Sequence, residues 1–271
     1  MQKIQKNARN KKIKITFLGT GTSCGIPVIG CNCSVCNSDN PKDNRTRSSI
    51  VVEEDGLNIL VDTSPDLRFQ ALRSGLKKID LVLFTHGHAD HIHGLDELRQ
   101  YNNLQRQEIP CYGNQETIDD LYRRYDYIFK KTQEGGGKPR LSFNVIEKPL
   151  TLNGLTIQPI KIRHGELNIL GYRINDLAYL TDCSYIPDAS KGYLYGLKLL
   201  ILDALRREKH STHFSLGEAI EVVNELKPKQ ALFTHICHQL SHNETNNELP
   251  SHIQLAHDGQ IIDLSSILFN N

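Results

Sequence analysis

The sequence predicts an α/β protein, and three observations support this prediction. Short apolar runs, such as residues 81–84, have the length and composition of strands that are buried on both faces. Longer segments between these runs, such as residues 115–131, have the amphipathic pattern of helices. Histidine and aspartate residues directly follow several of the apolar runs, as ligands at the edge of a sheet would.

The composition is that of an ordinary globular chain. It has 271 residues, of which 38% are hydrophobic, and a formal net charge of +1. No stretch approaches the length of a membrane span, and the basic N-terminus lacks the apolar core of a signal peptide. We therefore expect a cytoplasmic protein with no membrane partner. Residues 1–12 should be a solvated basic tail and residues 13–271 a single domain.

The predicted elements alternate along most of the chain. An Asp-Gly pair is typical of a tight hairpin turn between residues 48–53 and 57–61. Ser215 and Glu218 form a capping box, which predicts the start of a helix. Strands are expected at 13–18, 48–53, 57–61, 81–84, 142–147, 155–162, 170–174, 177–180, 198–202 and 230–233. Helices are expected at 67–76, 92–103, 115–131 and 215–226, with a last helix and one short strand within 244–269.

The densest group of candidate ligands follows the apolar run at 81–84. It consists of His86, His88, Asp90 and His91. Two histidines spaced by two in an extended segment point to the same side, and the other pair can reach a second position nearby. Four ligands are more than one cation needs, so this loop is interpreted as half of a two-metal site. The alternative is a loop that is merely rich in histidine, but burying three imidazoles and a carboxylate without a cation is costly.

Single candidate ligands follow other strands. His164 and Asp182 each lie where a predicted strand ends, and His235 follows the last core strand. With the first loop, His164 supplies a third nitrogen for one metal and Asp182 a carboxylate able to bridge two. Asp62 ends an earlier strand and is either a partner for an imidazole N–H or a helix cap.

Three cysteines form a second ligand group. Cys31, Cys33 and Cys36 lie within six residues, a spacing that lets three thiolates wrap one tetrahedral zinc ion with a fourth ligand from elsewhere. Because no secretion signal is found, this spacing favours metal binding rather than disulfides. It also favours a reducing compartment. Three unrelated buried thiols are the alternative. Cys24 lies outside the pattern and is expected to be an ordinary small residue.

The segment around residues 113–140 is interpreted as a helical insertion able to cover a site. Its basic and aromatic residues suggest the hypothesis that some of Arg123, Arg124 and Tyr127 touch a substrate. The alternative is that they form a solvated helix face.

The ordered set of strands, histidine loop, single His, single Asp and late His resembles the metallo-β-lactamase superfamily. This resemblance implies a four-layer αββα sandwich with metals at one edge. It implies that His86, His88 and His164 hold one metal. It further implies that Asp90, His91 and His235 hold the other and that Asp182 bridges the two.

Within that superfamily, the cysteine group and Thr234-His235-x-x-His238 resemble the phosphoribosyl 1,2-cyclic phosphate phosphodiesterase (PhnP-like) family. The resemblance implies a structural zinc held by Cys31, Cys33, Cys36 and His238. It also implies that His213, before the late helix, assists the leaving group. Asp90 and His213 are therefore the expected catalytic residues.

These features lead to an expected function. The protein should be a dinuclear hydrolase with two zinc or manganese ions, cleaving a small phosphodiester by means of a hydroxide between the cations. One alternative is a ribonuclease Z-like enzyme, which would add a nucleic-acid partner. Another is a carrier resembling the pyrroloquinoline quinone biosynthesis protein B group. Whether the chain forms a homodimer is left open.

Overall fold

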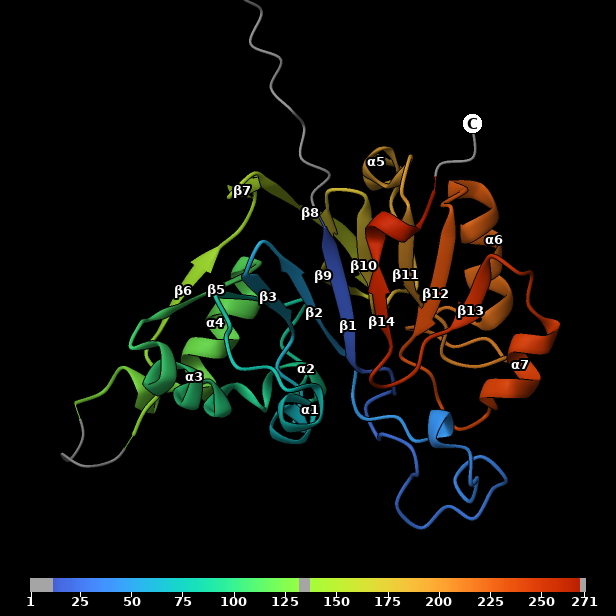
Figure 1. Cartoon of the computed structure of the whole chain (residues 1–271), viewed down its shortest axis with the longest axis horizontal. Helices are drawn as coiled ribbons and strands as arrows, with labels where there is room; N and C mark the ends of the chain where they lie inside the picture. Colours follow the sequence, from blue (N-terminus) through green and yellow to red (C-terminus); the bar gives the residue numbers. More distant parts are fainter. Residues whose placement is uncertain (1–11, 132–136, 269–271) are drawn as a thin grey trace, which may run out of the picture.

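A computed structural model describes residues 12–131 and 137–268. Residues 1–11 of the predicted tail and 132–136 of the predicted insertion lie outside the described residues. Within the described residues, two seven-stranded sheets pack face to face and helices cover both outer faces (Figure 1). This four-layer αββα arrangement confirms the predicted fold class.

The strands are distributed evenly between the two sheets. The first sheet has the order β14-β1-β2-β3-β4-β5-β6 and the second β13-β12-β11-β10-β9-β8-β7. The strands of the first sheet are β1 Ile13–Gly19, β2 Ser49–Glu54, β3 Leu57–Val61, β4 Leu81–Leu83, β5 Ile109–Gly113, β6 Leu141–Val145 and β14 Ile261–Asp263. Those of the second are β7 Leu150–Leu152, β8 Leu155–His164, β9 Leu167–Ile174, β10 Leu177–Leu180, β11 Leu199–Asp203, β12 Gln230–Thr234 and β13 Ile253–Leu255.

The helices are short, and two of them, α1 and α4, end earlier than the sequence predicts. They are α1 Leu67–Ser74, α2 Ala89–Ile92, α3 Leu98–Gln105, α4 Gln115–Arg124, α5 Asp188–Lys191, α6 Leu216–Leu226 and α7 His242–Glu248. The helix predicted at 92–103 is divided between α2 and α3. At the break, Gly94 passes so close to the Ser64 carbonyl that a Cβ would lie 2.0 Å from its oxygen. The C-terminal region contains two strands, β13 and β14, where one was predicted.

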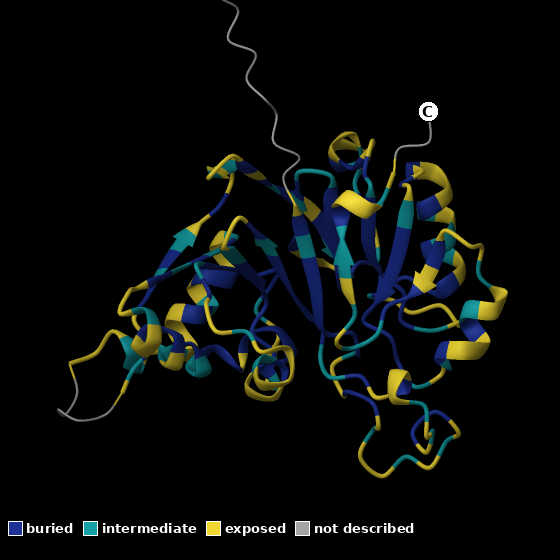
Figure 2. Ribbon diagram, in the orientation of Figure 1, coloured by how far each residue is buried: buried dark blue, intermediate teal, exposed yellow. Residues whose placement is uncertain are grey.

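Side chains alternate along each strand, so that one face of a sheet packs against the other sheet and the opposite face packs against the helices. In β2, Ile50 and Val52 pack between the two sheets, whereas Val51 packs beneath the helices of the first sheet. Figure 2 shows the strands largely buried between outer helices that expose one face. A fully buried side chain of this size contributes about 1.5–3 kcal/mol, so the core between the sheets provides much of the driving force for folding.

Parallel strands bring the candidate ligands to one edge of the sandwich. In the first sheet, β3, β4, β5 and β6 run parallel, so their carboxyl ends lie together. In the second, β10, β11 and β12 are parallel, and β8 has the same direction because β9 is antiparallel to both neighbours. The sheets are joined near this edge, where the Tyr172 hydroxyl donates to the Phe84 carbonyl at 2.7 Å.

The segment predicted as a helical insertion belongs to the sheet architecture. Helix α4 connects the parallel strands β5 and β6 and begins directly after Asn114, whose side chain caps it by accepting from the Thr117 N–H. The helix ends at Arg124, because Tyr125 turns inward and its hydroxyl donates to the Ile92 carbonyl at 2.8 Å. Helix α4 is therefore fastened to the segment that follows the histidine loop.

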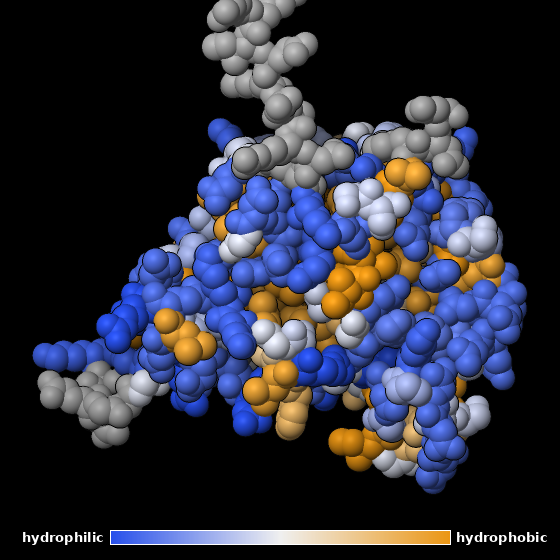
Figure 3. Space-filling view, in the orientation of Figure 1, coloured by the Kyte–Doolittle hydropathy of each residue, from blue (hydrophilic) through white to orange (hydrophobic). Residues whose placement is uncertain are grey.

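The surface is mostly polar. Figure 3 shows a largely hydrophilic face with separate hydrophobic patches over α1 and over the loop between β1 and β2. Exposed apolar residues in these two places include Phe69, Leu72 and Ile29. None of the helices within the described residues has both the length and the apolar character needed to cross a bilayer.

Candidate functional site

Six imidazoles form a closed ring where the two sheets meet at the edge described above. Neighbouring ring centroids lie between 4.3 and 6.1 Å apart all the way round. In order, the ring consists of His86, His88, His164, His213, His235 and His91. These residues come from the ends of β4, β8 and β12 and from the loop after β11. They are distant in the sequence and meet only in the folded chain.

The candidate ligand atoms fall into two groups. One consists of His86, His88 and His164, and the other of Asp90, His91, Asp182 and His235; within each group, one ligand atom per residue lies within 4.8 Å of all the others. Asp182 also lies within that distance of His164 and His213, so its carboxylate stands between the two groups. Its oxygens lie 3.1 Å from Nε2 of His91 and 3.2 Å from Nε2 of His235. Both of these imidazoles belong to the second group, and the proximity to His164 places Asp182 next to the first group as well, where a bridging carboxylate would be expected.

Polar partners outside the ring fix the orientation of its histidines. The Asp62 carboxylate lies 2.7 Å from Nδ1 of His91 and accepts from the Thr85 hydroxyl at 2.8 Å. Because that hydroxyl is used as a donor, it accepts from Nδ1 of His86 at 3.0 Å. Nδ1 of His91 and Nδ1 of His86 therefore carry hydrogens, and Nε2 of each ring is the atom that a cation would bind. Asp62 is thus a partner of an imidazole, which confirms the first of its two predicted roles.

The inward nitrogens are buried without hydrogen bonds. Among the described residues, Nε2 of His86, His91 and His235 has no hydrogen-bond partner of acceptable geometry. On the other side of the ring, Nδ1 of His164 donates to the Thr212 carbonyl at 2.7 Å, which leaves its Nε2 free as well. Buried polar atoms are rarely left unpaired, because losing hydration costs about 1–3 kcal/mol per group. Bound cations would satisfy these atoms.

Three site residues have left-handed backbone conformations. The φ angles of Asp62, Asp182 and His235 are 63°, 54° and 57°. Asp62 and His235 directly follow β3 and β12, and Asp182 lies two residues after the end of β10, so in each case the chain turns where the strand gives way to the site. Such conformations cost about 1–3 kcal/mol and are concentrated at functional sites, where surrounding structure holds them. The strain therefore marks the same edge as the ligand pattern.

The electrostatics also favour cations. Burial alone would lower the pKa of His91, but the carboxylates of Asp182, Asp90 and Asp62 raise it well above its usual range. For His235, burial is likewise outweighed by Asp182 and Asp90, and its pKa rises to about 9. A buried site that holds protons this strongly has an excess of negative charge, which divalent cations would neutralise. The donor set of imidazoles and carboxylates fits zinc or manganese.

Asp203 is a further site residue, which the sequence prediction missed. This fully buried residue ends β11, and its Oδ2 lies 3.0 Å from Nδ1 of His213 while Oδ1 lies 3.7 Å from Nδ1 of His235. The backbone N–H of Cys183 also donates to Oδ2 at 3.1 Å. Asp203 therefore contacts both the candidate acid and a candidate ligand. The sequence feature that could have identified Asp203 is its position at the end of an apolar strand, which resembles the position of Asp182.

Helix α4 forms one wall of the site. A Cβ on Gly87 would lie 2.6 Å from Oδ2 of Asp120, so the middle residue of the His-x-His pair is where α4 packs against the loop. Arg123 and Arg124 line the cavity beside His88, but both guanidinium groups pair with Asp120. Tyr127 does not reach this cavity; its hydroxyl donates to Asp96 instead.

The cysteine group forms a compact second site. The sulfurs of Cys31, Cys33 and Cys36 lie 3.2, 3.5 and 3.6 Å from Nδ1 of His238. A tetrahedral zinc ion with bonds of about 2.3 Å to sulfur and 2.0 Å to nitrogen would separate those atoms by about 3.5 Å. Backbone N–H contacts, chiefly from Cys36, lower the pKa of Cys33 to about 6. The four residues therefore fit a zinc ion.

A buried ion pair attaches this cysteine loop to the active-site edge. The guanidinium of Arg45 donates to the carbonyls of Cys237 at 3.0 Å and Leu240 at 2.7 Å. It also pairs with Asp43 at 3.0 Å, and the side chains of both residues are almost fully buried. The loop before β2 is therefore held against the segment that follows His235.

Comparison with known proteins agrees with this geometry. The model of the beta-lactamase superfamily domain matches residues 57–236, which is more than half of the chain. The chain belongs to the beta-lactamase superfamily. As a member, it is similar to the crystal structure of a diphosphatase from the PhnP family, with 44% identity and a TM-score of 0.87. The match covers 93% of this chain and 97% of that one.

Two relatives known from their sequences extend the comparison within the superfamily. The chain is 37% identical over 222 residues to the coenzyme PQQ synthesis protein B of Methylorubrum extorquens, covering 70% of this chain and 72% of that protein. It is also 37% identical over 262 residues to the octanoyltransferase of Porphyromonas gingivalis. That match covers 94% of this chain but 53% of the relative, so the chain spans about half the length of that protein.

Proposed function

We propose that this chain is a metal-dependent phosphodiesterase that acts on a cyclic phosphate or another small phosphodiester. The observation that carries the proposal is the closed imidazole ring with Asp182 between its two ligand groups. His86, His88 and His164 would hold one cation, and Asp90, His91 and His235 the other. Asp182 would bridge them. Two such cations supply Lewis acidity toward a phosphoryl group and lower the pKa of bound water.

The other residues of the chain provide orientation and proton transfer. His213 donates its Nδ1–H to Asp203, so Nε2 is free to take the proton released by the attacking water. It then passes this proton to the oxygen that leaves phosphorus, and the Asp203 carboxylate stabilises the intervening imidazolium. Burial and the neighbouring His235 lower the pKa of His213 to about 4, so the proton is given up readily.

The thiol site is proposed to bind one structural zinc ion. It would hold the loop before β2 next to the segment after His235, in addition to the Arg45–Asp43 pair. The three thiols must stay reduced to bind metal, which is consistent with a cytoplasmic location.

The relatives suggest substrates to be compared. The structure with 44% identity is that of a diphosphatase, so the P–O–P bond belongs among the tested linkages. The octanoyl transfer named for the P. gingivalis protein need not involve the matched half of that longer protein, and it is not part of this proposal. The similarity to PQQ synthesis protein B keeps a carrier role as the second candidate.

A direct assay tests the proposal. The full chain, loaded with Mn²⁺ or Zn²⁺, should hydrolyse bis(4-nitrophenyl) phosphate, a five-membered cyclic phosphate or a nucleoside diphosphate. The His164→Ala variant should lose this activity. The His252→Ala variant, which changes an exposed imidazole outside the ring, should retain it. A fully metallated protein that cleaves none of these substrates would exclude the phosphodiesterase and favour the carrier.

A further inference from the structure

The histidine ring is accessible from its His88 side. His88 is exposed, whereas His86, His164 and His213 are buried. A cavity of about 510 Å³ begins at this side and is lined by His86 and His88 together with residues of α4 and β9. A substrate bound at the candidate ligands therefore has free space on the α4 side of the site.

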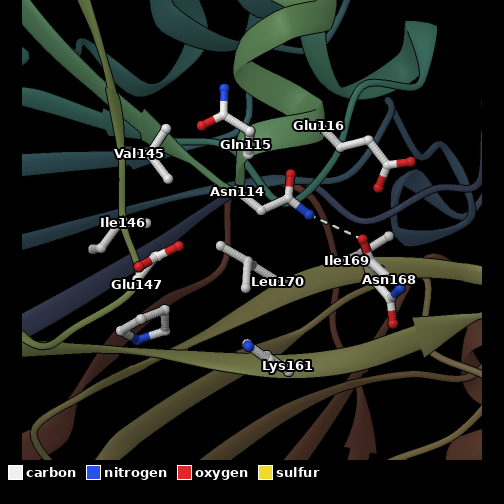
Figure 4. Close-up of a pocket in the computed structure, with 11 residues that line it drawn as sticks. Asn114, Gln115, Glu116, Val145, Ile146, Glu147, Lys161, Asn168, Ile169 and Leu170 are labelled. Carbon is white, nitrogen blue, oxygen red and sulfur yellow. Dashed lines mark hydrogen bonds between the residues drawn. The ribbon is translucent and has the colours of Figure 1, made fainter.

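A second cavity of about 420 Å³ continues from the first. The two share Glu116, Asn168 and Ile169 in their walls. Figure 4 shows side chains from the start of α4, the end of β6 and strands β8 and β9 arranged around its opening. Where the two cavities meet, the Asn114 side chain donates to the Asn168 carbonyl at 2.9 Å and ties α4 to β9.

The walls of these cavities suit an uncharged group. Val145, Ile146 and Leu170 give the second cavity apolar surface, and polar and charged residues complete its lining. The residues that line the two cavities include four carboxylates and three cationic side chains. Two of those cationic side chains already pair with Asp120. A second phosphate would find no surplus positive charge here. The combined volume falls in the range of sites for drug-sized organic ligands.

The position of His213 determines which part of the substrate occupies the cavities. His164 stands between His88 and His213, with centroid distances of 5.1 Å and 4.7 Å. His213 is not among the residues that line either cavity. If His213 protonates the leaving oxygen, that oxygen faces away from α4. The substituent that stays on phosphorus then extends in the opposite direction, past His88.

We infer that the two cavities bind the retained substituent of the phosphodiester, and that this substituent is an uncharged organic group at least as large as an aryl ring. The inference rests on the proposed function and adds a substrate class to it. A small cyclic phosphate alone would leave both cavities unused. The retained group would pack against the apolar wall while its phosphate stays at the candidate ligands.

Matched esters test this inference. Each carries the same 4-nitrophenolate leaving group, and the retained group is methyl, phenyl or the anionic 2-carboxyethyl. For the wild-type chain we expect kcat/KM for the phenyl ester to exceed that for the methyl ester by about tenfold. The difference should lie mainly in KM, because the larger group makes more contacts with the apolar wall. The carboxyethyl ester should gain nothing over the methyl ester.

Two variants that fill the second cavity separate binding from folding. Val145→Trp and Gln115→Trp should each reduce the phenyl-to-methyl ratio by about tenfold. Leu104→Trp, at an exposed position of α3 outside both cavities, should leave the ratio unchanged. Calorimetric binding of the product analogue phenyl phosphate, compared with methyl phosphate, gives a second readout that needs no turnover.

The outcomes distinguish this inference from the proposed function. The subsite is overturned if all three esters are cleaved with equal KM values, or if neither tryptophan variant changes the phenyl-to-methyl ratio of kcat/KM. Either result would still agree with the proposed phosphodiesterase. A preference for the anionic ester overturns the uncharged group. Failure of a fully metallated chain to cleave any ester removes the phosphodiesterase, and the subsite with it.

Discussion

The Asp203 carboxylate holds His213 in the position that a proton carrier needs. Its Oδ2 lies 3.0 Å from Nδ1 of His213, and both side chains are buried or nearly so. The His213 ring stacks on that of His235 with an interplanar angle of 12°. Asp203 therefore fixes His213 beside a candidate metal ligand, with Nε2 of His213 directed away from the carboxylate.

Replacing His213 tests its role in protonating the leaving group. For an alkyl leaving group, His213→Ala should lower kcat by about 10²–10⁴-fold, because the departing alkoxide then receives no proton. For 4-nitrophenolate the loss should be much smaller, since this anion needs no proton to leave. Metal content, measured by elemental analysis, should not change. A loss of one active-site metal would instead make His213 a ligand.

Replacing Asp203 tests whether it acts through His213. Asp203→Asn should reduce kcat by about 10–100-fold for alkyl leaving groups, because the amide orients the imidazole less well and cannot stabilise its charged form. The double variant with His213→Ala should be no slower on these esters than His213→Ala alone. Additive losses would show that Asp203 acts independently, for example through His235.

The candidate ligands could be predicted from their positions in the sequence. The His86 loop and the cysteine group each place several ligands within six residues, so their spacing alone indicates a metal. His164, Asp182 and His235 lie at or just after the ends of β8, β10 and β12, and the shared direction of those strands brings them to one edge. An ordered series of strand ends therefore indicates which residues can meet.

Asp203 and the cavities could not be predicted in the same way. An aspartate at the end of a strand is as often a turn residue, and its contact with His213 depends on how the loop after β11 folds back. The position of α4 depends on Gly87, where the absent Cβ leaves room for Asp120. These features arise from packing between distant segments, for which the sequence has no periodic signal.

The thiol site should bind zinc independently of the active site. Cys36→Ser should remove one zinc equivalent per chain and lower the free energy of unfolding by about 3 kcal/mol, because the metal no longer links the cysteine loop to His238. Cys24→Ser, at an exposed thiol outside the cluster, is the matched control. Loss of metal from the histidine ring in Cys36→Ser, with the thiol site still filled, would contradict the assignment.

The buried pair of Arg45 and Asp43 should be important for stability. Arg45→Met should lower the free energy of unfolding by about 3–5 kcal/mol, because it leaves the Asp43 carboxylate buried without its cation. Arg47→Met, which breaks the more exposed pair with Asp66, should cost about 1 kcal/mol. Urea denaturation measures both. Adding Asp43→Asn to Arg45→Met should restore part of the loss, and a further loss would contradict this explanation.

His242 should make stability depend on pH. Its ring is buried with Nδ1 unpaired among the described residues, and burial, followed by the charges of Lys42 and His257, lowers its pKa from 6.5 to about 4. The folded chain therefore keeps His242 neutral while the unfolded chain takes up a proton. The stability is complete above pH 6.5 and declines as the pH falls toward 4.

The His242→Gln variant isolates this contribution. Between pH 7.5 and 5.0, the wild-type chain should lose about 1 kcal/mol more of its unfolding free energy than His242→Gln, after allowing for partial solvation of the ring. His252→Gln changes an exposed imidazole and should follow the wild type. Because the metal sites are the same in all three proteins, their own acid sensitivity cancels in the comparison. Parallel stability curves for wild type and His242→Gln would show that His242 is protonated equally in both states.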